Sequence, residues 1–444
     1  MKNSKITLEY AKTLDEQDSL KGFRDRFHLP KTNAQKIIYF CGNSLGLQPK
    51  GVKEQIAEEL DKWADFGVEG HFKPENPWIS YHEKLKQNTA GLVGANASEI
   101  AVMNTLTVNI HLLMVSFYNP TKERFKIICE HGAFPSDLYV MASQAKFRGF
   151  NPDEVIVELK PRDGEHTLRT EDITEAIRAN GNELALIWIG GVNYYTGQAF
   201  NLKKIAEVGH EVGAIVGYDL AHAAGNIELN LHDWNVDFAA WCTYKYMNSG
   251  PGGISAVFIH EMHGSRADLP RFTGWWGNDL ASRFKMSREF TPAAGADGWS
   301  LSTSPIMLMA PLKTSLELFK EAGFAHLIEK RKLLTGYLEE VVNEIAEKYA
   351  NEIALTIITP RNEEERGAQL SIVVGKNGKA IFNKLMENGV LCDWREPEVI
   401  RLAPTPLYNT FEEVYQFGKI FDSILAEEAE EKVRREMYPL SFSG

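Results

Sequence analysis

The sequence is poor in cysteine, has no excess of positive charge and contains no long apolar run. Its four cysteines are widely spaced without a CxxC pair, which argues against a disulfide framework and a zinc site; they are Cys41, Cys129, Cys242 and Cys392. The formal net charge of −12 argues against a nucleic-acid-binding protein, which needs a basic face. No apolar stretch approaches the ~20 residues of a membrane span, and the first residues lack the apolar core of a signal peptide. These absences predict a soluble, cytoplasmic protein without a metal, nucleic-acid or membrane partner.

What is present is the composition of an ordinary globular enzyme, with 44% hydrophobic, 24% charged and 11% aromatic residues. With 444 residues, the chain exceeds the size at which a single hydrophobic core stops growing, so we expect two domains. We place a large domain at 46–310 and a smaller domain at 1–45 and 311–444.

From about residue 97 onward, short apolar runs alternate with helical patterns. The expected strands are Phe125–Cys129, Glu154–Glu158, Leu184–Ile189, Ala214–Tyr218, Phe238–Cys242 and Gly253–Ile259. The expected helices between them include Asp137–Phe147, Glu171–Ala179 and Leu202–Val212. This alternation predicts βαβ units, and therefore an α/β domain whose mostly parallel sheet has helices on both faces.

After Pro305 the pattern changes to long helices followed by shorter strands. The expected helices are Pro305–Lys320, Ala325–Ala350 and Lys379–Asn388, and the expected strands are Ile353–Ile358, Leu370–Val374 and Val399–Leu402. This part predicts a smaller α+β domain. The acidic run at 427–436 is read as the solvated end of a last helix.

Two chemical signatures lie 26 residues apart in the predicted α/β domain. The strand Ala214–Tyr218 is followed by Asp219, and His222 comes three residues later. The strand Phe238–Cys242 is followed by Lys245, just before a glycine-rich turn. Ligands of such sheets bind at the carboxyl ends of strands. A lysine that can form a Schiff base and an acid that can pair with a pyridinium nitrogen are what pyridoxal phosphate requires.

Each of these residues also has an ordinary structural explanation. A lysine is most often a solvated surface charge, an aspartate after a strand can cap a helix, and a histidine can pack in the core. Lys245, however, is flanked by Trp241, Tyr244 and Tyr246. We therefore expect its amine to enter a partly apolar pocket, where burial favours the neutral form that a Schiff base needs.

Three further segments could complete a cofactor site. Thr105 or Thr107 opens a predicted helix, where free backbone N–H groups and hydroxyls can hold a phosphate, although either could be a simple N-cap. Phe134 offers an aromatic face, with the acid Asp137 three residues later. The turn Gly274–Asn278 carries Trp275, whose indole N–H could reach a phosphate or could belong to a packed loop tip.

Together these segments resemble the kynureninase family, fold-type-I pyridoxal phosphate hydrolases that cleave L-kynurenine to anthranilate and L-alanine. The matching segments cover almost the whole chain: Tyr39–Pro49, Leu106–Asn109, Phe134–Asp137, Tyr195–Gln198, Asp219–His222, Tyr244–Lys245, Gly274–Trp275 and Ile400–Pro404. The aspartate, histidine and lysine are shared by many aminotransferase-like enzymes. The GNSLGL, FPSD and GWWG motifs together point to kynureninase.

The resemblance implies roles for individual residues. Lys245 corresponds to the Schiff-base lysine, Asp219 to the pyridinium partner, and Tyr244 to a residue that holds the cofactor. Because Tyr244 adjoins Lys245, it is also our candidate for a proton donor. The remaining cofactor contacts that the resemblance implies are Leu106, Thr107, Phe134, Pro135, Ser136, Asp137, His222, Trp275 and Thr303. The substrate contacts that it implies are Ser44, His71, Ser302 and Arg401, with Arg401 holding the α-carboxylate through its planar guanidinium. It also implies a homodimer with shared sites, to which Trp275 and Thr303 contribute across subunits, and a place in tryptophan catabolism or NAD biosynthesis.

Two positions depart from the family pattern. Gly190 stands where relatives often carry a hydroxyl side chain near the cofactor. Thr303 replaces an asparagine of animal relatives, which leaves the choice between kynurenine and 3-hydroxykynurenine open.

Other readings of the sequence also remain. A cysteine desulfurase or a class V aminotransferase would share the lysine and the aspartate, although no cysteine lies in an obvious mobile loop. A scaffold without catalytic activity would be colourless and unchanged by borohydride.

Overall fold

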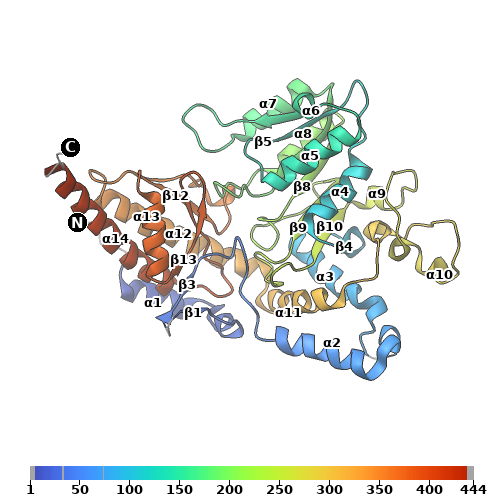
Figure 1. Cartoon of the computed structure of the whole chain (residues 1–444), viewed down its shortest axis with the longest axis horizontal. Coiled ribbons are helices and arrows are strands. Elements are labelled where there is room, and N and C mark those ends of the chain that lie inside the picture. Colours follow the sequence, from blue (N-terminus) through green and yellow to red (C-terminus); the bar gives the residue numbers. More distant parts are fainter. Residues whose placement is uncertain (1–5, 33–34, 74, 438–444) are drawn as a thin grey trace, which may run out of the picture. The chain divides into compact units, whose positions relative to one another are not determined.

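The computed structural model describes residues 6–32, 35–73 and 75–437 and divides into two compact units (Figure 1). Unit 1 comprises Met1–Leu47, Tyr195–Gly197 and Ala325–Gly444, and unit 2 comprises Gln48–Tyr194 and Gln198–Phe324. The boundary expected after residue 310 would cut helix α11 (Ile306–Ala322), which lies wholly in unit 2. The reason is packing: α11 lies against α2 (Val52–Phe66) and α3 (Tyr81–Val93) of the same unit.

Unit 2 is built on a seven-stranded sheet with the strand order β4-β10-β9-β8-β7-β5-β6. The strands are β4 (Ile100–Val102), β5 (Lys126–Glu130), β6 (Ile156–Leu159), β7 (Leu184–Gly190), β8 (Ile215–Asp219), β9 (Phe238–Cys242) and β10 (Ser255–Ile259). Only β10 runs antiparallel to its neighbours, and the other pairs are parallel. The predicted mostly parallel α/β sheet is confirmed.

Helices cover both faces of this sheet. Successive side chains of a strand point to opposite faces, so strands that are apolar throughout give the sheet two apolar faces to bury. Leu186 and Trp188 of β7 lie in one core cluster with residues of α4 (Leu106–Phe117) and α5 (Pro135–Phe147). Ile187, between them, points to the opposite face and packs against α8 (Leu202–Glu211). A Cβ at Gly209 of α8 would lie 2.7 Å from the Ile187 side chain, so only glycine fits there. The remaining helices of unit 2 are α6 (Pro152–Val155), α7 (Thr170–Asn180), α9 (Glu261–Gly264) and α10 (Leu280–Arg283).

An aromatic stack fills the core between α4 and the sheet. The rings of Phe117 and Phe238 stack at 4.5 Å between centroids, and Trp188 and Trp299 extend the stack on either side. Gly217, opposite Phe238 in the ladder, makes this possible, because a Cβ at Gly217 would lie 2.4 Å from the Phe238 ring. The stack anchors β7 and β9, whose carboxyl ends lie beside candidate site residues.

The predicted strand Glu154–Glu158 begins as a helix. Of Glu154–Glu158, the first two residues belong to helix α6, and β6 starts at Ile156. Asn151 caps the helix through its side chain, which accepts a hydrogen bond from the Asp153 N–H at 3.2 Å, and Pro152 occupies its first turn. This N-terminal helix signal outweighs the strand propensity of the following apolar residues.

Unit 1 contains a four-stranded antiparallel sheet with the order β11-β12-β15-β14. Its strands are β11 (Leu355–Ile357), β12 (Leu370–Val374), β14 (Asp393–Arg395) and β15 (Val399–Leu402). β3 (Ile38–Tyr39) pairs in parallel with β13 (Val390–Leu391), and β1 (Lys31–Thr32) pairs with β2 (Gln35–Lys36). The helices are α1 (Leu8–Gln17), α12 (Phe324–Lys348), α13 (Gly378–Glu387) and α14 (Phe411–Met437). This is the predicted α+β arrangement.

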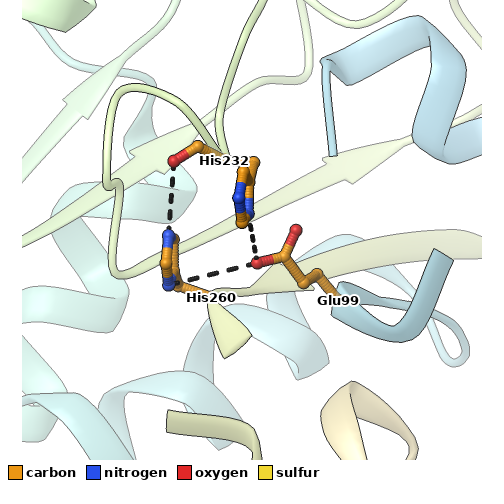
Figure 2. Close-up of side chains that lie close together, drawn as sticks. All are labelled: Glu99, His232 and His260. Atoms are coloured by element: carbon orange, nitrogen blue, oxygen red, sulfur yellow. Dashed lines mark hydrogen bonds and ion pairs between the residues drawn. The ribbon is translucent and has the colours of Figure 1, made fainter. Parts of the chain in front are cut away.

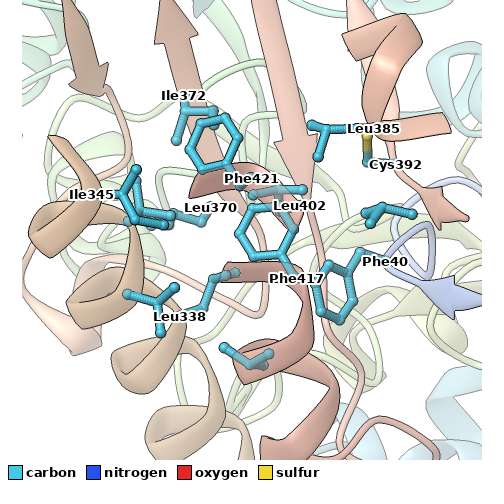
Figure 3. Close-up of a cluster of buried hydrophobic side chains, with 14 of the residues drawn as sticks. Phe40, Leu338, Ile345, Leu370, Ile372, Leu385, Cys392, Leu402, Phe417 and Phe421 are labelled. Carbon is cyan, nitrogen blue, oxygen red and sulfur yellow. The ribbon is translucent and has the colours of Figure 1, made fainter. Parts of the chain in front are cut away.

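The core of unit 1 packs long helices on one face of that sheet (Figure 3). Phe417 and Phe421 of α14 stack at 5.5 Å, and Phe40, which follows β3, meets Phe417 edge-on at 5.8 Å. All three side chains are fully buried. The segment after β3 is thereby fixed to the sheet that carries Arg401.

None of the helices in the described part of the chain has both the length and the apolar character that crossing a bilayer requires.

Candidate active site

Three acidic side chains meet at the carboxyl edge of the unit 2 sheet. Asp219 ends β8, Glu130 ends β5, and Asp137 lies in the first turn of α5. Between β8 and β5 runs β7, whose last residue, Gly190, pairs with Asp219. Asp137 and Glu130 are buried, which is unusual for carboxyl groups without a cationic partner.

The two aspartates are joined by a hydrogen bond. Burial together with the charge of Asp219 raises the pKa of Asp137 well above its usual range. Burial also raises the pKa of Asp219, but the charge of Lys245 and the Ala221 N–H, 2.7 Å from Oδ1, oppose that rise. The Trp188 indole N–H fixes Asp137 from the other side at 3.0 Å. We therefore assign the proton to Asp137 and the negative charge to Asp219.

Lys245 lies in the turn between β9 and β10, with its Nζ 5.9 Å from the centroid of the Phe134 ring. The turn is closed at its base, where the buried Thr243 hydroxyl hydrogen-bonds the Ser249 hydroxyl at 2.6 Å and the Ile254 carbonyl. Gly253 allows this closure, because a Cβ there would lie 2.2 Å from the Ser249 Oγ. The sequence-predicted lysine is thus held on a short, fixed loop beside the acids.

Tyr244 and Phe134 border the lysine. Burial, and then the neighbouring Cys242 thiol, raise the pKa of Tyr244 above its usual value, so its phenol keeps its proton. Phe134 precedes Pro135 and Ser136 at the start of α5, is 44% exposed and meets Tyr194 edge-on at 5.2 Å. Phe134 therefore presents an open ring face to a planar ligand.

The first turn of α4 supplies the candidate phosphate site. Its N-cap residue, Thr105, makes no side-chain capping bond, and Thr107 is exposed in the first turn after Leu106. Backbone N–H groups in a first helical turn have no partner within the helix and can bind a phosphate. His222, also expected near the cofactor, is buried just beyond β8, where its carbonyl accepts from the Asn226 amide at 2.8 Å.

Trp275 is engaged within its own loop. Its indole N–H donates to the Arg283 carbonyl at 3.1 Å, and its ring meets Phe284 edge-on at 5.5 Å. A phosphate contact from this N–H would require the bond to Arg283 to open, so the contact stays a prediction.

Ser302 and Thr303 line a cavity of about 220 Å³ in unit 2, together with His82, Asn104 and Asp297. His71 packs edge-on against Trp78 at 5.1 Å, and its Nδ1 lies 3.1 Å from the Val68 carbonyl. None of the described contacts of His71, Ser302 and Thr303 involves Glu130, Asp137 or Asp219.

In unit 1, Arg401 lies on β15 with 1% of its surface exposed. Its guanidinium Nη2 is 2.5 Å from Asp393 Oδ2 and 3.2 Å from the Ser44 hydroxyl. The sequence-predicted substrate residues Ser44 and Arg401 are therefore in contact.

Glu130, Trp188 and Asp393 were missed by the sequence analysis. Glu130 had a signal: it directly follows a predicted strand, just as Asp219 does. Its carboxylate accepts from the Gly190 N–H, 3.3 Å from both oxygens, and burial followed by the charge of Asp219 raises its pKa to about 7. A Cβ at Gly190 would lie 2.9 Å from Glu130 Oε1. Glu130 therefore occupies the space that a larger side chain at position 190, where this chain departs from the family pattern, would need.

In unit 2, the side chains of Glu99, His232 and His260 lie close together (Figure 2). Two histidines and a carboxylate can bind a metal ion in other proteins. Here Glu99 Oε1 accepts from His232 Nδ1 at 2.9 Å and from the Glu261 N–H at 2.8 Å, and His260 Nδ1 accepts from the Met262 N–H at 3.2 Å. The two imidazole rings stack almost parallel, at 3°. Parallel stacked rings cannot direct both in-plane lone pairs at one ion, so we interpret the cluster as a structural hydrogen-bond network.

The fold, the acid that ends β8 and the lysine beyond β9 define a pyridoxal phosphate-dependent enzyme of fold type I. Solved structures share this fold at low identity. A cysteine desulfurase from Thermococcus onnurineus is 19% identical with a TM-score of 0.72, over 88% of this chain and 95% of that one. A cysteine desulfurase from Escherichia coli is 16% identical with a TM-score of 0.73, over 92% and 99%. At these identities the likeness establishes the fold alone.

Sequence comparison identifies the family. The family model of the kynureninase C-terminal domain matches residues 327–421. The kynureninase of Flavobacterium psychrophilum is 55% identical over 414 residues, which are 93% of this chain and 97% of the relative. That of Homo sapiens is 47% identical over 430 residues, 93% and 92% of the two chains. The chain belongs to the kynureninase family.

Proposed function

We propose that this chain catalyses the hydrolytic cleavage of the Cβ–Cγ bond of L-kynurenine, or of its 3-hydroxy form, with pyridoxal 5′-phosphate as cofactor. The products are anthranilate, or 3-hydroxyanthranilate, and L-alanine. The reaction serves tryptophan breakdown, and its 3-hydroxy branch can supply NAD biosynthesis. The observation that carries the proposal is the Asp137–Asp219 pair beside Lys245, in a chain of this family.

The residues of unit 2 fit the cofactor. The acid cluster contains one ionised aspartate, Asp219, oriented by the Ala221 N–H, and a pyridinium nitrogen is the cation that such a group pairs with. Phe134 offers a ring face, and the first turn of α4 offers N–H donors to the phosphate. When bound, the cofactor supplies a protonated ring that withdraws electrons from the bonds of the substrate α- and β-carbons.

The remaining chemistry belongs to the side chains around the lysine. Lys245 supplies the amine that binds the cofactor and then takes the proton from the substrate α-carbon. Water adds to the γ-carbonyl of the substrate, so that the γ-carbon leaves as the carboxyl group of anthranilate when the Cβ–Cγ bond breaks. Tyr244, which keeps its phenol proton, donates that proton to the β-carbon. Asp219 holds the ring nitrogen in its protonated state, and Asp137 fixes the orientation of Asp219 through their hydrogen bond.

Substrate recognition is assigned to both units. Arg401 and Ser44 of unit 1 bind the α-carboxylate, because a buried guanidinium is suited to a planar anion. His71, Ser302 and Thr303 of unit 2 contact the aryl end or complete the site. Thr303, in place of the asparagine of animal relatives, is the position that bears on 3-hydroxylation.

We assign the chain to a homodimer in the cytoplasm. Support for the dimer comes from a strip of exposed apolar side chains on α2 and the turn after it: Leu60, Trp63, Phe66, Val68 and Phe72, which are 42–73% exposed. Phe72 contacts Phe284, which contacts Trp275, so a subunit covering the strip would lie beside a proposed cofactor residue. The four free cysteines suit a reducing compartment.

The decisive experiment is a product assay on the purified holoprotein. Kynurenine should give fluorescent anthranilate, whereas a desulfurase would release sulfide from cysteine and an aminotransferase would form a keto acid. Lys245→Ala should abolish turnover and the visible absorbance of the bound coenzyme, while the exposed Lys160→Ala should retain both. Anthranilate formation by Lys245→Ala at a near-normal rate would refute the assignment.

A further inference from the structure

Arg401 belongs to a polar cluster in unit 1 that also contains Asp393, Arg395 and Ser44. Three of the described contacts converge on one oxygen, Asp393 Oδ2, and Arg401 also donates to the Ser44 hydroxyl at 3.2 Å. Arg401 Nη2 lies 2.5 Å from it, Arg395 Nη2 lies 3.3 Å from it, and the Ser44 hydroxyl donates to it. The Asp393 side chain is 13% exposed and that of Arg401 is 1% exposed, so solvent screens their interaction weakly. The Arg395 side chain is 37% exposed, so solvent screens its interaction with Asp393 more strongly.

The sequence builds this cluster through strand register. β14 and β15 are antiparallel, and Asp393 lies directly opposite Arg401, which places both side chains on the same face. Arg395, two residues beyond Asp393 on β14, points to that face as well. Ser44 reaches the cluster because β3 pairs with β13 and Cys41 bridges to Ala403, next to the end of β15.

The charges in the cluster do not cancel. In the described ion pairs, two guanidinium groups, Arg395 and Arg401, face one carboxylate, Asp393, so these three side chains together carry a net charge of +1. The adjacent thiol adds no charge, because burial and the charge of Asp393 raise the pKa of Cys41 to about 12. A single carboxylate therefore neutralises the cluster, whereas a dianion would leave an excess of negative charge in a buried place.

We propose that Asp393 is the specificity-determining partner of Arg401: it fixes the guanidinium and sets the charge of the subsite, so that the subsite accepts one carboxylate and rejects a dianion. This inference rests on the proposed role of Arg401 in binding the substrate α-carboxylate. Without Asp393, Arg395 and Arg401 would form a doubly positive pair that suits a compact dianion.

The test measures competitive inhibition of the full-length holoenzyme by acetate and by malonate, which differ by one carboxylate. In the parent enzyme, malonate should inhibit no better than acetate. Asp393→Asn keeps an oxygen acceptor but removes the charge, so malonate inhibition should strengthen at least tenfold relative to acetate. Asp422→Asn, which removes an ion pair with Lys348 in the same unit, is the matched control and should leave the ratio unchanged.

The ratio distinguishes this role from a merely structural one, because general damage to the fold would weaken both inhibitors. An unchanged malonate-to-acetate ratio in a folded Asp393→Asn enzyme would overturn the proposal. If that variant does not fold, Arg395→Gln gives the opposite test: it leaves Arg401 and Asp393 with no net charge. Its KM for kynurenine should rise at least fivefold with kcat retained, and an unchanged KM would also overturn the proposal.

Failure of the underlying function has a different signature. If Arg401→Ala leaves the KM and both inhibition constants unchanged, the carboxylate is bound elsewhere, and the proposals for both Arg401 and Asp393 are refuted. If Arg401→Ala weakens acetate binding and Asp393→Asn changes nothing, only the role of Asp393 is refuted.

Discussion

Both units bury carboxyl groups, but the groups that surround them differ: unit 2 places three acids beside one lysine, and unit 1 places one acid beside two arginines. In unit 2, Glu130, Asp137 and Asp219 converge with Lys245 as the nearby cation, and burial raises all three pKa values. In unit 1, Asp393 is outnumbered by Arg395 and Arg401. With the proton on Asp137, the ionised Asp219 is balanced by Lys245 in unit 2, and Glu130, with a pKa of about 7, carries only part of a charge. In unit 1 the described contacts leave an excess of positive charge.

The difference matches the charges that each subsite is proposed to bind. A pyridinium nitrogen brings a positive charge to the aspartate pair, and a substrate α-carboxylate brings a negative charge to Arg401. A buried charge without a partner is unfavourable. The proposed ligand groups would supply the partner, the pyridinium nitrogen for Asp219 and the substrate α-carboxylate for Arg401. The following predictions break this balance at one residue at a time, from the largest expected effect to the smallest.

The largest contrast should lie between the two hydrogen-bonded aspartates. Asp219→Asn removes the anion that pairs with the cofactor ring, and we expect kcat/KM to fall by about 10³-fold or more, which corresponds to ~4 kcal/mol. Asp137→Asn replaces a protonated acid with an isosteric amide that can still donate to Asp219 and accept from Trp188, so its loss should stay within about tenfold. Steady-state kinetics of both variant holoenzymes give the two values of kcat/KM. A larger loss in Asp137→Asn than in Asp219→Asn would place the proton on Asp219.

Arg401→Ala should be next in size. Removal of the guanidinium leaves a substrate carboxylate without its partner, so we expect a rise in KM equivalent to ~2–5 kcal/mol with a smaller change in kcat. Arg361→Ala is the matched control, because that arginine is 80% exposed in the same unit. Equal KM values for Arg401→Ala and the control would contradict the proposed carboxylate site.

Glu130 should make the apoprotein less stable as the pH rises. Its pKa is raised from the ordinary 4.5 to about 7, so the folded state holds a proton that the unfolded state releases between these values. The stability should therefore fall across this window, and the full penalty remains above pH 7. Glu130→Gln should remove that slope and stabilise the apoprotein at alkaline pH by at most ~3 kcal/mol. Urea unfolding of both apoproteins at acid and alkaline pH tests the sign, and parallel curves would contradict it.

The smallest effect is expected at Gly190. Gly190→Ala places a Cβ 2.9 Å from Glu130 Oε1, the far end of a flexible side chain that can move aside. We expect a loss of ~1 kcal/mol in unfolding free energy. The loss should disappear in the Glu130→Ala background, because the opposing atom is then gone. Additive losses in the double variant would show that Gly190 is constrained by something else.

The strands were predictable where local pattern and burial agree. Phe238–Cys242, Leu370–Val374 and Val399–Leu402 have the predicted bounds, because all three are apolar runs in the interior of a sheet. Glu154–Glu158 failed at its start, because the capping bond of Asn151 begins a helix there. The edge strand β4, with three residues, is too short to be recognised from its pattern.

In the candidate site, too, some residues could be predicted from local sequence pattern and others could not. Asp219 was visible as an acid directly after an apolar strand, and Lys245 was visible as a lysine in the turn that follows the next strand. Glu130 could have been found by the same rule as Asp219. Trp188 could not, because a tryptophan in a buried strand is read as core. Nor could Asp393, since its contact with Arg401 depends on the pairing of β14 with β15. The bond from Trp275 to the Arg283 carbonyl was equally invisible.

The sequence by itself determined the α/β class and the family, and it indicated which residues we expect to face the cofactor, because short motifs and strand ends are local properties of the chain. Only the tertiary structure decided which acid holds the proton, which glycine makes room for Glu130, and how many charges surround Arg401. Those outcomes depend on burial and on distances between residues far apart in the sequence, and both are set when separate strands come to lie side by side.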